Sequence, residues 1–455
     1  MSLISNETTQ NNNSQLNDIW LNTNELNEKL KVFASEDEII LSQNVSLGLK
    51  GHLNRNTLVF NNNRREFVKS FVLPNLLSDS NHISRIVTDL NGEIYDQVKE
   101  NLKTQGYDIK VLNLLDMSQS NKYNPMEYIK NENDATNLAN IILYNSWEQE
   151  PNEIFKTPTE ALLTSLIFLV GVHGDELHIE KTLLTVLNLL KEIITDLQNN
   201  TNKASAVKYF EAMNDIGWYF DNNGTFVTGK PLAESCYEYH SPKGIADYGV
   251  KKWNLFTVAT SGKTRLNICL SLAVCLSVLN VSAVTNLVSD DEFCLDMLRD
   301  KKTVLFVIVP ATNNTYNFLA ATLYAQVMNF TQFIYKNELN TEGNHIQCIM
   351  SDASIIRYIP NMDMALACAE NASYVIHAKN IAELKQCKRN PYEAAELYGI
   401  NIFQGTIDSD TSEYLYNRLG GRPLNNHLTQ RFFIPKNKCA ILIHEDGLRT
   451  IDDCI

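Results

Sequence analysis

Paired cysteines are absent from the sequence, which excludes the common zinc and disulfide frameworks. The nine cysteines lie far apart, with no C-x-x-C pair and no nearby paired histidines, so we expect no metal site. An odd number of thiols with mostly apolar neighbours is typical of a protein kept in a reducing compartment. The lack of metal-binding and disulfide patterns therefore predicts a cytoplasmic location for the protein.

The sequence also lacks an export signal. Its first residues, MSLISNETTQNNNSQLND, contain no basic segment followed by an apolar one, so residues 1–35 are predicted to be a flexible polar tail. Of the longest apolar stretches, 161–172 is too short to cross a bilayer and 268–284 contains several Ser and Asn residues, which indicates buried helices. We expect a cytoplasmic protein without a transmembrane helix, which reaches the inner face of the plasma membrane only through partners.

Positive charge is scarce. The chain has 39 Lys and Arg residues against 53 Asp and Glu residues, a formal net charge of −14, and no dense basic block. Because sequence-independent binding of duplex DNA depends on neutralising phosphates, general DNA binding is disfavoured. Any DNA contact is expected to be indirect.

Alternating strand and helix patterns are present at both ends of the chain. Between Leu58 and Leu114, short β-branched segments alternate with helical patterns, which argues for βαβ units and a parallel sheet. After Asp300, nearly continuous apolar segments return, as strands buried on both faces require. These later segments are KTVLFVIVP (302–310), IQCIMSDA (346–353), ASYVIHA (372–378), INIFQGT (400–406) and CAILIHE (439–445).

The middle of the chain has a different periodicity. Residues 135–290 repeat apolar positions at helical spacing with no clear strand, which predicts an all-helical domain. The predicted fold class is therefore α/β, a mostly parallel sheet flanked by helices, built from residues 36–134 and 291–455 with the helical domain inserted between them. We find no internal repeat.

Glycine is missing from the joint between the first strand and the following helix. In many nucleotide-binding folds, glycines here allow backbone N–H groups to surround phosphates. The pattern favours an ordinary solvated loop, with an anion site formed by two arginines at a helix start as the alternative. The joint reads Asn61, Asn62, Asn63, Arg64, Arg65, Glu66, Phe67 and Val68.

Two acidic residues end predicted strands. Asp89 lies where open α/β sheets bind ligands, but it also precedes a helix that it could cap, and we favour the cap. Asp352 lies where a Walker-B carboxylate would hold Mg²⁺, yet the next residue is Ala353, and ATPases usually have a glutamate there. Neither acidic residue alone establishes a catalytic site.

Two other features receive structural interpretations. The segment TSGKT at 260–264 imitates part of a phosphate loop, but it lacks the preceding glycine and lies in the helical block, so it is interpreted as a coincidence. The histidines near strand ends have no recognisable nucleophile beside them, which argues against serine- or cysteine-triad chemistry. They are His345, His377 and His444.

Several segments together resemble the TraG-like type IV coupling protein family of conjugative DNA transfer ATPases, in the form found in Gram-positive mobile elements. The resemblance extends in the family's order from about Glu36 to Asp453. It implies a RecA-like P-loop NTPase fold with an inserted helical domain, ring assembly, ATP and Mg²⁺ as cofactors, and delivery of relaxase-bound DNA to a type IV secretion channel. The segments are FVLPNLL (71–77), IVTDLNGEIYDQVKENLKTQGYDIKVLNLLDMSQSNKYNPMEYI (86–129), KTVLFVIVPATNNTYNFLAATLYAQV (302–327), SDASIIRYIPNMD (351–363) and HLTQRFFIPKNKCAILI (427–443).

The departures from the family pattern fall on its catalytic motifs. The family's G-S-G-K-T corresponds to residues 64–68, so Phe67 replaces the phosphate-binding lysine and Val68 the Mg²⁺-binding hydroxyl. Loss of the lysine removes a charge-assisted phosphate contact. Glu66 would also repel a triphosphate.

The remaining catalytic positions are altered as well. The glutamate of the family's D-E-F is Ala353, and the lysine of its D-P-K-G-E is Asn91. An arginine-containing segment corresponds to CAEN around Cys368, and a strand-ending glutamine corresponds to Lys379. Each lost group is typically worth orders of magnitude in rate.

The sequence thus predicts a pseudo-ATPase, and leaves open whether the chain is an enzyme. It would be a catalytically degenerate coupling-protein-like subunit acting as an adaptor, assembly or regulatory component in conjugative DNA transfer or type IV secretion. Residues 61–68, with Asp89 nearby and Asp352 and Ala353 across the sheet, would be a vestigial site with no catalytic residue. No cofactor is expected unless this site still binds ATP and Mg²⁺.

Two other functions remain open. The chain is alternatively an active ATP-dependent DNA-translocating coupling protein in a mixed assembly, supplying Arg64 or Arg65 to a neighbour, or a non-enzymatic nucleic-acid-binding module. The expected partners are other coupling-protein or type IV secretion subunits, in a homo- or hetero-oligomeric ring. DNA or relaxase would be contacted only indirectly.

Overall fold

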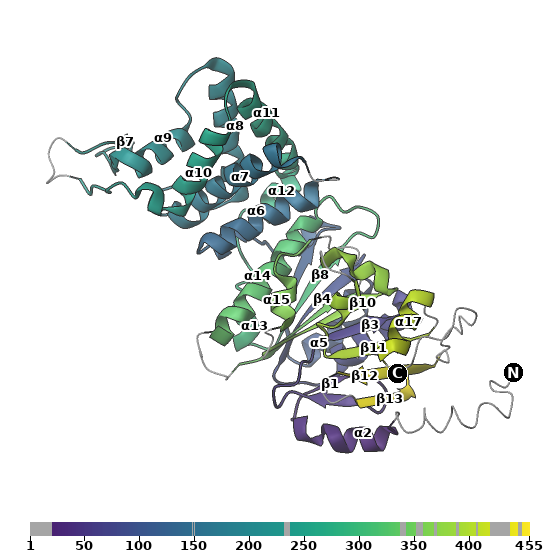
Figure 1. The fold of residues 1–455 in the computed structure, drawn as a ribbon. Coiled ribbons are helices and arrows are strands. Elements are labelled where there is room, and N and C mark those ends of the chain that lie inside the picture. Colours follow the sequence, from purple (N-terminus) through teal and green to yellow (C-terminus); the bar gives the residue numbers. More distant parts are fainter. Residues whose placement is uncertain are drawn as a thin grey trace.

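A nine-stranded sheet forms the core of the lower part of the molecule in Figure 1. The computed structural model describes residues 21–147, 149, 151–231, 237–336, 343–351, 358–367, 371–387, 391–405, 408–418, 437–444 and 448–455. The strand order is β13-β12-β11-β3-β10-β9-β4-β8-β5. The strands are β3 (Thr57–Phe60), β4 (Ile83–Leu90), β5 (Asp108–Asn113), β8 (Thr303–Val309), β9 (His345–Met350), β10 (Ala372–Ala378), β11 (Ile400–Gln404), β12 (Lys438–Ile443) and β13 (Leu448–Asp453).

The sheet is parallel except at one edge. From β11 to β5 every neighbouring pair runs in the same direction, whereas β12 and β13 are added antiparallel. All the strands expected from the sequence are present at their predicted positions, which confirms the α/β fold class. The sequence did not indicate β13, nor the small pair β1 (Glu38–Ile40) and β2 (Ser46–Gly48).

Helices cover both faces of this sheet. Because successive strand residues point to opposite faces, Val59 belongs to one buried cluster while Leu58 and Phe60 belong to the other. The first face, on the side of Val59, is covered by α3 (Arg64–Phe67), a π-helical turn η2 (Val68–Val72), α4 (Leu73–Leu77) and α5 (Glu93–Thr104).

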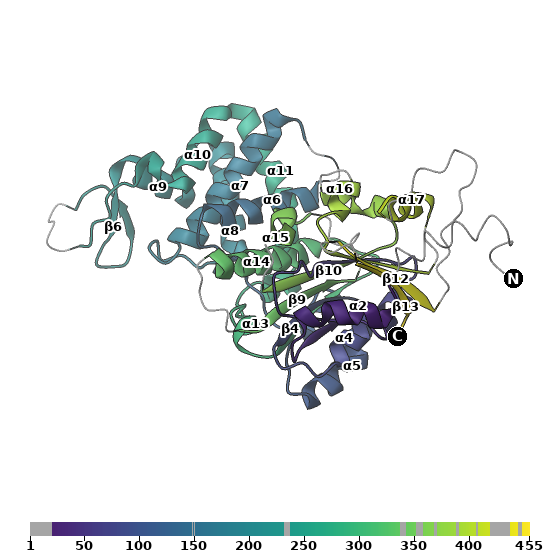
Figure 2. The same ribbon diagram turned by 60° about the horizontal axis from the view of Figure 1, so that its bottom comes forward.

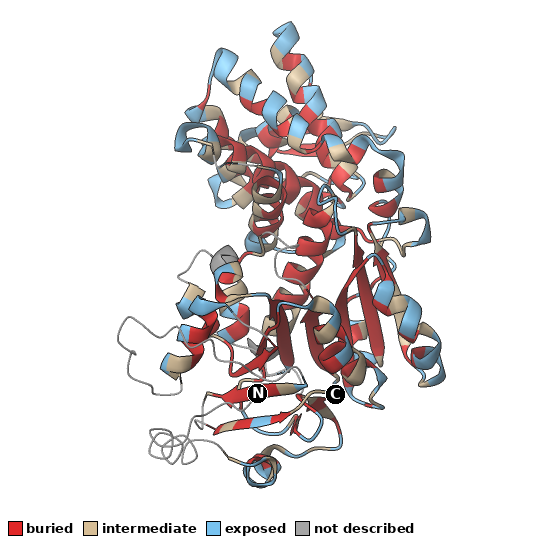
Figure 3. Cartoon of the chain, turned by 90° about the vertical axis from the view of Figure 1, so that its right-hand side faces the viewer, coloured by how far each residue is buried: buried red, intermediate tan, exposed pale blue. Residues whose placement is uncertain are grey.

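The second face carries the C-terminal helices. Figure 2 shows α16 and α17 on the side of the sheet opposite α4 and α5. Figure 3 shows the strands as almost continuously buried, which explains their unbroken apolar character. The elements on this side are α14 (Asn317–Lys336), α15 (Met362–Ala367), η8 (Ile381–Cys387), α16 (Pro391–Ala395) and α17 (Ser409–Arg418), with the short α13 (Met297–Asp300) before β8.

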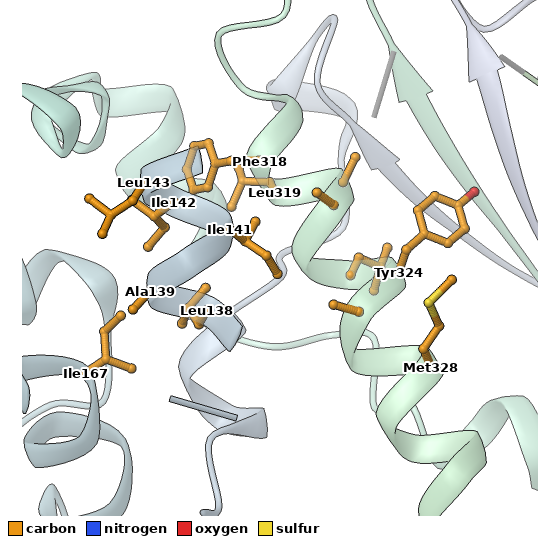
Figure 4. Close-up of a cluster of buried hydrophobic side chains, with 14 of the residues drawn as sticks. Leu138, Ala139, Ile141, Ile142, Leu143, Ile167, Phe318, Leu319, Tyr324 and Met328 are labelled. Atoms are coloured by element: carbon orange, nitrogen blue, oxygen red, sulfur yellow. The ribbon is translucent and has the colours of Figure 1, made fainter. Parts of the chain in front are cut away.

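A largely helical domain is inserted between β5 and β8. It meets the second face through α6 and α14, where Ile141 points toward α14 and belongs to the same buried cluster as Leu319 (Figure 4). Its elements are α6 (Glu132–Ser146), α7 (Glu153–His173), α8 (Leu183–Asn199), α9 (Ser205–Glu211), α10 (Tyr248–Ala259), α11 (Gly262–Cys275) and α12 (Ser282–Leu287), with short turns η3 (Met117–Gln119), η4 (Pro125–Tyr128), η5 (Ala212–Ile216), η6 (Gly244–Ala246) and η7 (Ser277–Asn280) around them.

This domain also contains an antiparallel pair that the sequence did not reveal. Strands β6 (Trp218–Phe220) and β7 (Phe226–Thr228) form a hairpin that projects from the helices (Figure 1). Each strand has three residues, too few to show an alternating pattern. The turn between them uses Gly224 at a positive φ of 74°, which favours glycine.

The long apolar helix α7 is the core of the inserted domain. By length and composition it could cross a membrane, but 72% of its most apolar window is buried inside the molecule. It packs between α6, α8 and α10. This burial is what a core helix requires, as the sequence predicted for the stretch 161–172.

The prediction of a flexible tail over residues 1–35 is wrong for its second half. Residues 23–30 form the helix α2 (Thr23–Leu30), followed by the turn η1 (Lys31–Phe33). Asn22 and Glu25 make a capping box at its start, and Leu26 and Leu30 are buried against the sheet edge. The polar composition of this segment gave no helical pattern, because the helix is stabilised by two buried leucines and a capping box. Residues 1–20 lie outside the described residues.

Candidate functional site

The loop after β3 lies at the carboxyl end of the parallel strands, where open α/β sheets bind ligands. Two of its backbone donors are taken by its own asparagine side chains. The Asn61 Oδ1 atom accepts the N–H of Asn63 at 2.7 Å, and the Asn63 Oδ1 atom accepts the N–H of Arg65 at 3.1 Å. The asparagines therefore occupy donors of the kind that glycine-rich loops direct at phosphates.

Phe67 fills the space beneath this loop. Its side chain is fully buried. The ring stacks on the imidazole of His377, with centroids 4.6 Å apart and planes 12° apart, and on Phe71 at 5.7 Å. Phe67, which the sequence analysis matched to the lysine of the family motif, is thus the centre of an aromatic stack, and its neighbour Val68 is also buried.

The His377 side chain, in β10, contacts the residues that follow two other strands, β9 and β3. Its Nδ1 atom lies 2.9 Å from the carbonyl oxygen of Ser351, after β9, and its Nε2 atom lies 2.8 Å from the carbonyl oxygen of Asn61, after β3. Carbonyl oxygens only accept hydrogen bonds, so a ring nitrogen that carries a proton donates to the carbonyl oxygen that faces it. His377 thus joins the ends of β3 and β9 at the loop.

Gln404, at the end of β11, completes the packing from the other side. Its Oε1 atom accepts hydrogen bonds from Asn61 Nδ2 at 3.0 Å and from Ser70 Oγ at 3.2 Å. The sequence reasoning placed Lys379 at the position of a strand-ending glutamine and missed Gln404. Lys379 instead lies beyond β10, half-exposed, beside Glu383. The last residue of INIFQ, a polar side chain closing an apolar strand, was the available signal.

Asp89 caps the following helix, as the sequence analysis favoured. Its carboxylate accepts the backbone N–H groups of Ile94 at 3.0 Å and Tyr95 at 2.8 Å, at the start of α5. Burial raises the pKa of Asp89 to about 6, despite these bonds and the nearby Arg64. The amino end of α5 is therefore already filled by a carboxylate of the chain itself.

The arginines of the loop differ in their surroundings. The guanidinium of Arg64 lies 4.0 Å from Asp89 and 3.7 Å from Glu93, whereas Arg65 is exposed. Because two carboxylates face Arg64, the local charge does not favour an added anion there. Glu66, next along the loop, lies beside Gly405 at the end of β11.

The second half of the predicted site is only partly visible. Asp352, Ala353 and Cys368 lie outside the described residues. Ser351 is buried at the end of β9 and donates its hydroxyl to the carbonyl oxygen of Thr88 at 2.6 Å. Within the described ranges, no group of three or more His, Cys, Asp or Glu side chains could hold a metal ion.

The TSGKT segment and the hydroxyl-rich turn around it play no part in this site. Gly262 begins α11 directly after α10, so the segment follows a helix and not a strand. Arg265 in this helix donates to the carbonyl oxygens of Thr257 and Thr260, each at 2.6 Å. The geometry is that of a turn between two helices.

Comparison with known proteins agrees with this architecture. The family model described as "Type IV secretory system Conjugative DNA transfer" matches residues 24–398. A comparison with curated protein sequences finds no match.

Solved structures of plasmid coupling proteins share the fold. TrwB in complex with the non-hydrolysable ATP analogue ADPNP is 10% identical with a TM-score of 0.61, covering 96% of this chain and 92% of that chain. TrwB with ADP and Mg²⁺ is 11% identical with a TM-score of 0.58, covering 96% and 93%. The unbound monoclinic form of TrwBdeltaN70 is 11% identical with a TM-score of 0.58, covering 96% and 92%.

At these identities the structural likeness establishes the fold, which is the RecA-like P-loop NTPase fold expected from the sequence. The family match extends from α2 to the segment before β11, and so includes the inserted helices and strands from both parts of the sheet, but not β11, β12 and β13. This protein therefore belongs to the type IV secretory system conjugative DNA transfer family, that of the TraG-like type IV coupling proteins.

Proposed function

We propose that this chain is a catalytically degenerate coupling-protein subunit that acts as an adaptor, assembly or regulatory component of a conjugative transfer system. The observation that carries the proposal is the stack of Phe67 on His377 beneath a loop whose N–H groups bind asparagine side chains. A phosphate loop needs free backbone donors and a cation at this point. Here aromatic packing replaces the flexible cation of the motif.

ATP with Mg²⁺ does not fit these residues. A triphosphate would have to displace Asn61 and Asn63 from the loop's own N–H groups and would approach Glu66. Val68 offers no hydroxyl to Mg²⁺. The TrwB relatives are described in complex with ADPNP and with ADP and Mg²⁺, and we infer that this member of the family has lost that capacity.

The function of such a subunit lies in protein contacts. We propose that it joins other coupling-protein or type IV secretion subunits in a ring and meets DNA or relaxase only through them, since the net charge is −14 and general DNA affinity depends on positive charge. It would act on the cytoplasmic side of the membrane, held there by partners.

Equilibrium binding of labelled ATP to the full chain, at millimolar Mg²⁺, tests the proposal. A glycine-rich-loop ATPase serves as the positive control, and Phe67→Lys asks whether restoring the ammonium alone restores binding. We expect no saturable binding by either form up to millimolar nucleotide. Saturable micromolar binding by the unaltered chain would overturn the proposal.

An active role in a mixed assembly is the second candidate, because Arg65 is exposed at the loop and arginines supplied by a neighbour stabilise charge on a transferring phosphoryl group. The test adds this chain, or its Arg65→Ala variant, to a catalytically intact coupling protein of the same system. Stimulation of ATP hydrolysis that disappears with Arg65→Ala would favour this candidate. A mobility shift with duplex DNA at physiological salt would favour the nucleic-acid-binding alternative.

A further inference from the structure

Two cysteines meet at the antiparallel edge of the sheet. In the pairing of β12 with β13, Cys439 lies opposite Asp452, and the N–H of Cys454 donates to the carbonyl oxygen of Asn437 at 2.8 Å. Directly opposite residues share a face, and so do residues two apart along a strand. Cys439 and Cys454 are therefore diagonal neighbours on the same face, close enough for each to shift the pKa of the other, while the Cys439 Sγ atom lies 3.8 Å from the carbonyl oxygen of Asp452.

The pair lies at the end of the edge strand. Cys439 is buried in the cluster on the first face, the face that also holds Phe67, while Cys454 packs against that cluster and is half-exposed. Among the described residues β13 is the outermost strand of the sheet, and an isolated bridge joins it to Leu21. Cys454 follows the last residue of β13, so the approach needed to bring the two sulfurs to bonding distance is made beyond the strand itself.

We propose that Cys439 and Cys454 form an intramolecular disulfide when the protein meets a low-molecular-weight disulfide such as oxidised glutathione. The Cys454 thiolate attacks one sulfur of the small disulfide and forms a mixed disulfide, releasing one small thiolate. Cys439 then gives its proton to a departing thiolate and attacks the Cys454 sulfur, which displaces the second small thiol. One small disulfide is reduced to two thiols, and the two protein thiols are oxidised to one disulfide.

The electrostatics of the pair agree with this order of attack. The neighbouring Cys439 thiol lowers the pKa of Cys454, whereas the Cys454 side chain and burial raise the pKa of Cys439. Elsewhere burial raises the pKa of Cys269 to about 12 and also raises that of Cys275. Among the described cysteines, the one whose thiolate is favoured is thus the half-exposed member of the pair, and reactivity follows the thiolate.

A disulfide here would fix an edge that holds the first described residues of the chain. The N–H of Leu21 donates to the carbonyl oxygen of Arg449 at 2.9 Å, and the Thr450 hydroxyl donates to the carbonyl oxygen of Leu21 at 3.0 Å. The carboxylate of Asp452 accepts from Ser42 at 2.7 Å and from the backbone of Asn44 at 2.8 Å. Oxidation would therefore stabilise the attachment of α2 and of the loop before β2. This inference does not depend on whether the chain binds nucleotide.

Titration of the full chain with glutathione buffers of increasing oxidised fraction tests the proposal. The products are digested without reduction and sorted by mass spectrometry. We expect a peptide pair linked through Cys439 and Cys454, lighter by two hydrogens than the separate peptides. The matched control Cys275→Ser, another half-buried cysteine, should form the same link.

Two variants separate the steps. Cys454→Ser should abolish both the link and the mixed disulfide, and Cys439→Ser should stop the reaction with glutathione bound at Cys454. Oxidation should raise the Tm of the unaltered chain and leave that of Cys454→Ser unchanged, which decides the matter even if Cys439→Ser does not fold. The proposal is overturned if the exposed Cys294 takes up glutathione while Cys454 remains free, or if urea-unfolded protein forms the link equally well.

Discussion

Replacement of Phe67 by alanine is the perturbation that most directly tests the interpretation of the loop. The side chain is 0% exposed and stacks on two rings. Truncating a buried phenylalanine costs about 3–5 kcal/mol, and aromatic pairs contribute roughly 0.5–1.5 kcal/mol beyond area burial. We expect Phe67→Ala to lower the free energy of unfolding by about 4 kcal/mol, and Phe67→Leu, which keeps most of the volume, by about 1–2 kcal/mol.

Urea unfolding followed by circular dichroism, together with hydrogen exchange, measures this effect. Exchange should rise in peptides covering β3 and β10, because the stack joins the ends of these strands through His377. Peptides from α8 and α9, in the inserted domain, are the internal control and should change little. A loss below about 1 kcal/mol for Phe67→Ala, with unchanged exchange in β3, would refute the view that this ring holds the loop closed.

Three further outcomes follow from side chains elsewhere in the structure. His377→Phe keeps a ring for stacking but leaves the carbonyl oxygens of Ser351 and Asn61 without the imidazole donor. It should lower the free energy of unfolding in urea by about 1–3 kcal/mol, and an unchanged midpoint would contradict the role of these hydrogen bonds. Burial lowers the pKa of His345 to about 3, so below pH of about 6.5 the unfolded chain binds a proton at this residue that the folded chain does not bind. The free energy of unfolding should therefore fall by up to about 1.4 kcal/mol per pH unit between those two pH values. His345→Gln should flatten this slope in acid-unfolding curves, and an unaltered slope would show that other groups cause it. Hydrogen bonds from Lys243 and His173 outweigh burial and lower the pKa values of Glu176 and Asp247 in the inserted domain. The stabilisation by these carboxylates is therefore present above their unfolded pKa values and is lost as pH falls through the lower folded values. The fluorescence of Trp218, whose ring stacks on His240 beside this network, should report the loss; Asp247→Asn should make the acid response smaller, and an equal response in that variant would contradict the role of Asp247.

Local sequence pattern was sufficient for the sheet but not for what fills its ligand edge. The central strands are continuous apolar segments, and their positions follow from that property alone. β13 was missed because only every second residue is buried and one of these, Asp452, is charged and satisfied by Ser42 and Asn44. α2 was missed because its stability comes from a capping box and two leucines in a polar segment.

The site itself depends on contacts between distant parts of the chain. The sequence favoured Asp89 as a helix cap, which the structure confirms, while the replacement of a lysine by Phe67 stays a prediction. It did not reveal that His377 stacks on Phe67, because 316 residues separate His377 from the carbonyl of Asn61 that it contacts. Nor did it reveal Gln404, which reaches Asn61 across 343 residues. Such pairs are set by sheet order, which periodicity does not encode.

The place of β3 in the sheet has a consequence for synthesis on the ribosome. Asn56, just before β3, accepts a hydrogen bond from the backbone of Tyr374 in β10, 318 residues later, and the other neighbour of β3, β11, is made later still. At synthesis rates of about 5–20 residues per second, β3 waits roughly 15–60 s for its partners. During that time a strand that is buried in the folded protein is exposed as an unpaired edge. We therefore expect newly made chains to need chaperones more than a protein whose neighbouring strands are also neighbours in sequence.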